Sequence, residues 1–179
     1  MQQEQLEQFD REFRTFAVTN YILNKLRSHG INDITNLKLQ KVLYLAYGLH
    51  LCLYDEDLFQ SPIHAWKHGP VVPDVYKEFK CFGKSVITKQ TGILLDDGSG
   101  EVYFPELTKN FEKRALIIAC TAYGKERAWD LVDITHNENS AWKKNYQEGK
   151  MHISIPKEDI RAELQDQLSG IAEYLSQPV

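Results

Sequence analysis

The sequence has few cysteines and no long hydrophobic run. Its 179 residues include three cysteines, far apart from one another, which are Cys52, Cys81 and Cys120. Small secreted domains depend on dense, paired cysteines, so this pattern argues against a disulfide framework and predicts reduced thiols. No apolar stretch approaches the roughly 18 residues that cross a bilayer, and the acidic N-terminus does not resemble a secretory leader. We therefore expect a cytoplasmic protein without a membrane partner.

An excess of positive charge is also missing, because the formal net charge is −4. Proteins that bind nucleic acid present basic surfaces that neutralise phosphates, so nucleic acid is a poor candidate partner. Hydrophobic residues make up 42% of the chain and charged residues 26%, which is an ordinary globular composition. With no internal repeat and no linker, the chain is expected to fold as one domain.

Helical periodicity dominates the first third of the chain. Residues 1–14 carry apolar side chains at spacings of three and four, which predicts a helical extension ahead of a domain over residues 15–179. Residues 15–28 continue the helical period. A further helix over residues 36–54, capped by Thr35, is apolar on nearly every side, which is typical of a helix surrounded by other elements. It is the predicted central helix.

The rest of the chain mixes turns, short strands and helices. Prolines between Ser61 and Pro73 exclude a helix there, so this segment is expected to be extended and turning. Asp74 is expected to cap a helix that ends before Gly83. Further predictions are a β-hairpin or three-stranded antiparallel sheet over residues 86–105, and helices over residues 108–124, 126–134 and from Pro156 to Leu175. The predicted fold class is mainly α (α+β), a compact helical domain around a buried central helix.

Two histidines give the sharpest hint of a metal. His64 and His68 are four residues apart, a spacing that directs two imidazoles to one ion when the segment is helical. The prolines exclude that helix. An extended chain would separate the two residues by roughly 13 Å, since each residue advances ~3.3 Å. No metal site is therefore predicted at this pair.

A second enzymatic pattern is incomplete. His136, Asn137 and Glu138 spell the H-x-E of zinc deaminases, but the P-C-x-x-C that completes such a metal site is absent. His136 is interpreted as anchoring a loop by hydrogen bonding. No P-loop and no G-x-S-x-G nucleophile motif is present either. We therefore predict that the protein is not an enzyme and has no cofactor; a hydrolase or metal enzyme that uses these residues is the minor alternative.

Polar and aromatic side chains concentrate in two neighbouring segments. They are Lys38, Lys41, Tyr44 and Tyr47 in the central helix, and Trp66, Lys67 and His68 beside Gly69 and Pro70. Tyrosine and tryptophan combine a large apolar area with a polar group, and lysine extends its charge beyond its stem, so these residues suit a surface that binds another protein. The alternative is that they tie the irregular segment to the helix. The sequence leaves both roles open.

Ordered motifs in the same segments resemble a known family. The runs ITNLKLQKVLYLAYGLHLCLY and SPIHAWKHGPVVPDVYKEFK, the second of which contains Tyr76, resemble the Panacea domain, also called the SocA-like antitoxin domain, of bacteria and phages. A later element with Thr135, His136 and Trp142 resembles the Thr-His segment of that family. The departures are mild, such as His68 at a position where tyrosine is common. The resemblance covers roughly residues 15 to 165.

The resemblance implies a type II antitoxin that binds and neutralises a cognate toxin without a cofactor. In some members it implies an adaptor that delivers the toxin to an ATP-dependent protease, which is the alternative function. Many members carry an additional DNA-binding or other domain, for which no residues are left over here, so a stand-alone antitoxin is expected. The motif residues named above are the expected partner-binding residues.

Overall fold

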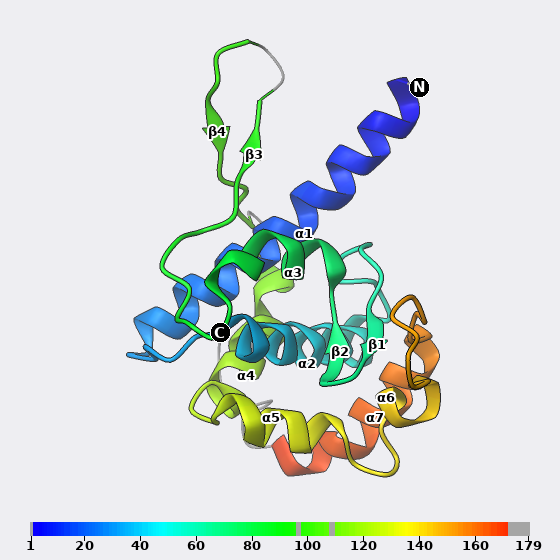
Figure 1. Ribbon diagram of the computed structural model, residues 1–179. Coiled ribbons are helices and arrows are strands. Elements are labelled where there is room, and N and C mark those ends of the chain that lie inside the picture. The colour runs from blue at the N-terminus through cyan, green and yellow to red at the C-terminus, as the bar shows by residue number, and fades with distance from the viewer. Residues whose placement is uncertain (1, 96–97, 108–109, 172–179) are drawn as a thin grey trace.

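Helices build most of the structure. The computed structural model describes residues 2–95, 98–107 and 110–171 (Figure 1). Within these ranges the helices are α1 (Gln2–Ser28), α2 (Asn36–Tyr54), α3 (Pro73–Phe79), α4 (Asn110–Tyr123), α5 (Ala128–Thr135), α6 (Ala141–Asn145) and α7 (Lys157–Gln167), with 3-10 turns η1 (Lys80–Phe82) and η2 (Leu168–Ile171). Two antiparallel hairpins accompany them, β1 (His64–Trp66) with β2 (Gly69–Val71), and β3 (Ile93–Leu94) with β4 (Val102–Tyr103). The predicted fold class is confirmed.

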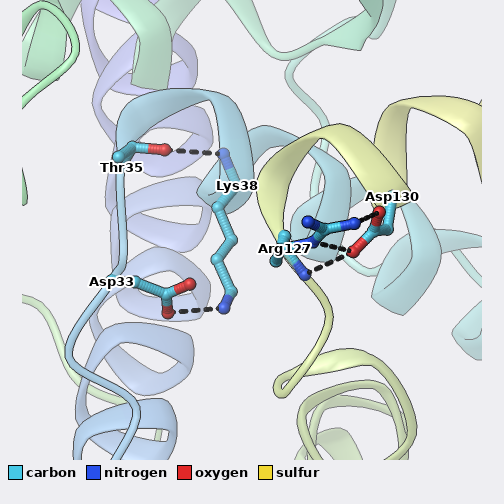
Figure 2. A network of polar contacts seen from close by, with 5 residues as sticks. All are labelled: Asp33, Thr35, Lys38, Arg127 and Asp130. Carbon is cyan, nitrogen blue, oxygen red and sulfur yellow. Dashed lines mark hydrogen bonds and ion pairs between the residues drawn. The ribbon is translucent and has the colours of Figure 1, made fainter.

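Helix α2 lies at the centre, as predicted. Helices α4, α5 and α7 pack around it, and α1 crosses it on a further side (Figure 1). The Thr35 hydroxyl caps its start by accepting a hydrogen bond from the Lys38 amide at 3.3 Å (Figure 2). Asp55 ends it in a left-handed conformation with φ 58°, and its amide donates to the Leu51 carbonyl. Every residue from Lys38 to Leu51 is buried, which confirms that the helix is surrounded by other elements.

Helices α2 and α7 approach each other closely at Gly48. A Cβ at this position would lie 2.6 Å from Leu164 Cγ and 3.1 Å from Ile160 Cγ2. Real Cβ atoms do not come so close to a packed side chain, so only glycine lets the two helices meet at this distance. This contact fixes α7 against the centre of the molecule.

A single uninterrupted helix occupies the region where the sequence suggested an extension followed by a helix. Helix α1 runs from Gln2 to Ser28 with no break between residues 14 and 15. The stretch contains neither proline nor glycine, so no residue in it stops the helix. Its second half enters the core through Val18 and Ile22, which are fully buried. The division into an extension and a domain stays a prediction.

The proline-rich segment forms the β1–β2 hairpin, which confirms that it is extended and turning. His64 pairs with Val71, and Trp66 pairs with Gly69 across the turn. Gly69 has φ 100°, a conformation that side chains with a Cβ rarely adopt. The strand β2 is buried along its whole length. This hairpin therefore belongs to the core, although it carries little regular structure.

Helix α3 begins two residues earlier than predicted. Val72 is the N-cap and Pro73 is the first helical residue, where its fixed φ suits the helix and its missing N–H is not needed. The Asp74 carboxylate, which was expected to cap the helix, instead accepts a hydrogen bond from the Ser61 hydroxyl at 2.8 Å. The proline therefore decides the start of this helix.

The β3–β4 hairpin confirms the strands predicted between residues 86 and 105, with two strands in the described part rather than three. Each strand has two residues, and the hairpin projects from the helical body beside the first half of α1 (Figure 1). Val86, at the start of the segment, instead forms an isolated bridge with Thr35. The projecting position leaves both residues of β4 exposed.

The C-terminal helix is shorter than predicted. Helix α7 begins directly after Pro156, as expected, but its α-helical part ends at Gln167 and continues as the 3-10 turn η2. Serine and glycine at positions 169 and 170 are weaker helix formers than the residues before them, which explains the change. Leu175 at the end of the predicted stripe, and Thr108 as the predicted cap of α4, lie outside the described residues.

Candidate functional site

Polar side chains of α2 hold the backbone that follows the β1–β2 turn. The Gln40 side chain accepts a hydrogen bond from the Val72 amide at 2.8 Å and donates to Asn36 Oδ1 at 3.1 Å. Asn36 donates to the Tyr76 carbonyl at 3.2 Å. Both amide side chains are buried. Because a proline-rich backbone lacks a regular ladder, these side chains satisfy groups that burial would otherwise leave unpaired.

Lys41 extends this row of contacts into the hairpin. Its side chain is fully buried, and Nζ donates to the Pro70 carbonyl at 3.0 Å. Removal of the amine from water lowers the pKa of Lys41 from 10.5 to about 7. Gly69 lies directly against it, since a Cβ on Gly69 would be 2.7 Å from Nζ. Lys41, Gly69 and Pro70 therefore form one packed unit.

His136 and Trp142 cover the same turn. Their rings stack with centroids 3.6 Å apart and planes 9° apart, and Trp142 Nε1 donates to the Trp66 carbonyl at 2.7 Å. Among the described residues, His136 Nε2 has no hydrogen-bond partner, so ring stacking is the contact that places the imidazole. Burial, together with the charges of Lys41 and His68, lowers the pKa of His136 to about 4. The imidazole is therefore neutral near pH 7.

Trp66 links the hairpin to the loop that precedes α7. Its Nε1 donates to the Met151 carbonyl at 2.6 Å, and its ring meets Tyr76 edge to face at a centroid distance of 4.9 Å. Trp66 is partly exposed and Tyr76 is 38% exposed. The aromatic pair thus supports the hairpin and also contributes to the surface.

The two-residue turn of the β1–β2 hairpin is the most accessible part of the site. Lys67 and His68 are exposed there, and the His68 ring meets Trp129 of α5 edge to face at 5.5 Å. Trp129 is 59% exposed, although tryptophan is usually well buried. The sequence analysis missed Trp129. Its position on an amphipathic helix, opposite the buried Leu131, is the signal that would have indicated an exposed aromatic side chain.

Tyr44 belongs to a buried network of its own. Its hydroxyl donates to Glu163 Oε2 at 2.5 Å, and the same oxygen accepts a hydrogen bond from the Ala141 amide at 2.8 Å. Burial raises the pKa of Glu163, while the hydrogen bonds from Tyr44 and Ala141 oppose that rise. The network joins α2, α6 and α7. It explains how a carboxylate that is 5% exposed is tolerated in the core.

Lys38 and Thr135 make local contacts within or beside their own helices. Lys38 Nζ forms an ion pair with Asp33 at 2.6 Å just before α2 (Figure 2). The Thr135 hydroxyl donates to a backbone carbonyl one turn earlier in α5 at 3.0 Å. Figure 2 also shows Arg127 paired with Asp130 at the start of α5, at 2.7 Å. These contacts lie within or directly beside α2 and α5.

Tyr47 faces a surface pocket instead of the hairpin turn. Its hydroxyl donates to Asp57 Oδ1 at 2.9 Å, and Lys157 Nζ lies 3.4 Å from the same oxygen. With Phe59 and Ile160, these residues line a pocket of about 370 Å³. Burial raises the pKa of Tyr47, and the hydrogen bond to Asp57 raises it further. None of the other predicted site residues, all of which are described, lines this pocket.

The predicted site residues therefore divide into two groups. Around the β1–β2 turn the structure brings together Lys41, Trp66, Lys67, His68, Gly69, Pro70, Tyr76, His136 and Trp142. The structure places the remaining four, Lys38, Tyr44, Tyr47 and Thr135, away from this turn. In the first group the buried members shape the hairpin and the exposed members form a mixed aromatic and cationic surface. The buried members therefore tie the hairpin to the helix, which is one of the two roles interpreted from the sequence. The other role, contact with a partner, stays a prediction for the exposed members.

Side chains that could bind a metal are scattered over the described residues. No group of three or more histidine, cysteine, aspartate or glutamate side chains gathers there in a way that could hold an ion. His64 faces the ring of His152 at a centroid distance of 6.1 Å, whereas His68 faces Trp129. Over the same part of the chain, no helix is both long enough and apolar enough to span a membrane.

Comparisons with known proteins agree with the motifs. The family described as antitoxin SocA-like, Panacea domain, matches residues 39–143. Antitoxin SocA of Caulobacter vibrioides (strain NA1000 / CB15N) is 32% identical over 127 residues. That alignment covers 70% of this chain and 66% of the relative. No solved structure matches the chain significantly.

Proposed function

The chain belongs to the SocA-like antitoxin family with a Panacea domain, and we propose that it neutralises a cognate toxin by binding it directly. The family match over residues 39–143 is the observation that carries this proposal. A relative that is 32% identical is named an antitoxin. The proposed system is a type II toxin-antitoxin system. In it the protein acts in the bacterial cytoplasm, and its gene lies on a phage or another mobile element.

The chemistry of the β1–β2 turn supports binding rather than catalysis. Lys41, the most strongly buried amine of the site, donates to the Pro70 carbonyl and lies beneath the hairpin. Groups that hold the fold in this way are not free to act on a substrate. The exposed side chains Lys67, His68 and Trp129 combine aromatic area with positive charge, which suits a protein interface.

Co-expression with the proteins encoded by the flanking genes tests the proposal. Each flanking gene is induced in a host cell with and without this chain, and growth is followed. We expect one flanking protein to arrest growth, this chain to restore it, and the two purified proteins to elute together in size-exclusion chromatography. The proposal fails if no flanking protein is toxic, or if the toxic one is neither bound nor neutralised.

The same cells separate direct inhibition from delivery to a protease. The half-life of the flanking protein is measured after translation is stopped, with and without this chain. Restored growth with an unchanged half-life supports direct inhibition. A shorter half-life that depends on an ATP-dependent protease would instead support the adaptor function.

A further inference from the structure

We propose that one face of the β3–β4 hairpin also contacts the toxin, in addition to the exposed side chains at the β1–β2 turn, and that it receives a basic segment of the toxin with apolar side chains. This outer face consists of Leu94, Val102 and Phe104. The inference rests on the proposed function and names the surface through which the chain would act.

The strand register places the three side chains together. Leu94 pairs with Val102, and Ile93 pairs with Tyr103. Residues directly opposite one another in an antiparallel pair share a face, and so do alternate residues of one strand. Leu94 and Val102 therefore share the outer face, whereas Ile93 and Tyr103 lie on the inner face. Phe104 directly follows β4, and it is assigned to the outer face because a Cβ on Gly92 would approach both Val102 and Phe104.

The outer face is open to solvent. Leu94 is 66% exposed, and Val102 and Phe104 are each 48% exposed. Gly92 lies beside them, and a Cβ there would collide with Val102 Cγ1 and lie 3.2 Å from Phe104 Cε1. The absence of a side chain at Gly92 thus leaves room for the valine and the phenylalanine. Adjoining exposed apolar side chains of this kind mark interaction sites more often than isolated ones do.

The inner face and the base of the hairpin are already held by α1. Tyr103 stacks on Phe13 with centroids 5.7 Å apart and planes 14° apart. Asn20, which is buried, donates to the Thr91 carbonyl at 2.9 Å and to the Pro105 carbonyl at 3.2 Å, and its oxygen accepts from the Thr91 amide at 2.9 Å. One side chain therefore clamps both ends of the hairpin. A surface positioned in this way loses little conformational freedom on binding.

The charge of the segment indicates what kind of partner fits. Residues 90–107 contain four acidic residues and no lysine, arginine or histidine. Two of the acidic residues, Glu101 and Glu106, are exposed and flank the stretch of chain that contains Val102 and Phe104. Negative charge around an apolar face favours a partner that carries lysine or arginine beside apolar side chains. A second copy of this segment would instead bring like charges together.

The test uses the flanking protein that the wild-type chain neutralises in the co-expression assay. The first variant is Leu94→Thr/Val102→Thr/Phe104→Thr, which keeps residues that favour strands and removes the apolar face. The second is Glu101→Lys/Glu106→Lys, which reverses the charge. Val86→Thr is the matched control, because Val86 is 40% exposed and lies outside the outer face. Circular dichroism and thermal unfolding identify variants that fold as the wild type does.

We expect the triple threonine variant to weaken binding of the flanking protein at least about tenfold and to lose neutralisation, while the control retains both. The charge reversal should slow association several-fold at low ionic strength, and salt should reduce that difference.

If the wild type neutralises the flanking protein and the folded triple variant does so equally well, the inference is wrong and the proposed function stands. If that variant retains neutralisation but changes from dimer to monomer, the face joins two copies of this chain and the inference is equally overturned. A wild-type chain that neutralises no flanking protein overturns the proposed function itself, and the inference with it.

Discussion

The two hairpins of this molecule share a simple antiparallel geometry but differ in what surrounds them. Strand β2 is buried along its length, and side chains from α2 and α6 hold the β1–β2 hairpin from below. Both residues of β4 are exposed, and the β3–β4 hairpin is clamped at its base by Asn20. The first hairpin is part of the core, and the second projects from it (Figure 1).

This difference shows that a dense motif can serve the fold. The β1–β2 hairpin contains Pro70 and leads into Pro73, so the buried backbone here needs polar partners such as Gln40 and Lys41 from outside the strand. Each of these hydrogen-bonding side chains is needed at one particular position of the sequence. The residues therefore form an ordered motif. The β3–β4 hairpin needs few such partners. Its outer face is therefore free to serve recognition, and its sequence carries no comparable motif.

The largest expected difference between the hairpins concerns their glycines. Gly69→Ala should lower the free energy of unfolding by about 3 kcal/mol, because φ is 100° and the new Cβ would meet the buried Lys41 amine. Gly98→Ala in the β3–β4 turn should lower it by about 1 kcal/mol, since φ is 78° but no atom lies within 4 Å of the new Cβ. Urea denaturation measures both. Equal losses would contradict the assignment of the first hairpin to the core.

A second expected effect concerns Trp66. Trp66→Ala should lower the free energy of unfolding by about 2 kcal/mol, because it removes the hydrogen bond to Met151 and the ring contact with Tyr76. Trp66→Phe keeps much of the ring and should lower it by about 1 kcal/mol. Binding of the flanking protein is measured on the folded Trp66→Phe variant. Normal binding would indicate that Trp66 supports the fold, and lost binding would indicate that it also contacts the partner.

The buried amine of Lys41 should make stability depend on pH. In the unfolded chain the lysine keeps its proton up to its ordinary pKa of 10.5, whereas in the folded chain the pKa is about 7. Between these values the unfolded state binds more protons, so the free energy of unfolding should rise with pH, by up to about 1.4 kcal/mol per unit. Lys41→Met should remove this rise, and the exposed Lys143→Met should leave it unchanged. A rise of equal slope in Lys41→Met would show that another group is responsible.

The smallest expected effect comes from the same substitution made in both hairpins. Val71→Thr places a hydroxyl in buried strand β2 and should lower the free energy of unfolding by about 1 kcal/mol. Val102→Thr in exposed strand β4 should change it by less than about 0.5 kcal/mol. Thermal unfolding of the two variants gives the comparison. A larger loss from Val102→Thr would mean that the outer face is needed for folding, and would remove it as a free contact surface.

Much of the fold could be predicted from the sequence because its strongest signals are local. The cap at Thr35 and the apolar run behind it predicted the bounds of α2, and the prolines predicted the turning segment. The incorrect predictions concern helix ends, where one or two residues decide at which position the helix begins or stops. Pro73 moves the start of α3, and the weak helix formers at residues 169 and 170 end α7 early.

The candidate site was less predictable because its contacts join distant parts of the chain. The structure brings most of the motif residues together around the β1–β2 turn, but which of them are buried could not be predicted, and their contact with a partner stays a prediction. The Glu163 carboxylate that binds Tyr44 lies 119 residues away from it, and no spacing rule connects the two. The contact of Trp129 with His68 was not predicted because the two residues lie far apart in the sequence and no motif connects them.

The sequence alone determined the helical character of this protein, its central helix, its turning segment and its family, since each depends on residues that are neighbours in the chain. Only the tertiary structure decided that Lys41 is buried beneath a hairpin turn and that Leu94, Val102 and Phe104 are left uncovered. The physical reason is that burial depends on which elements pack over a side chain. That packing is settled by contacts between segments far apart in the sequence.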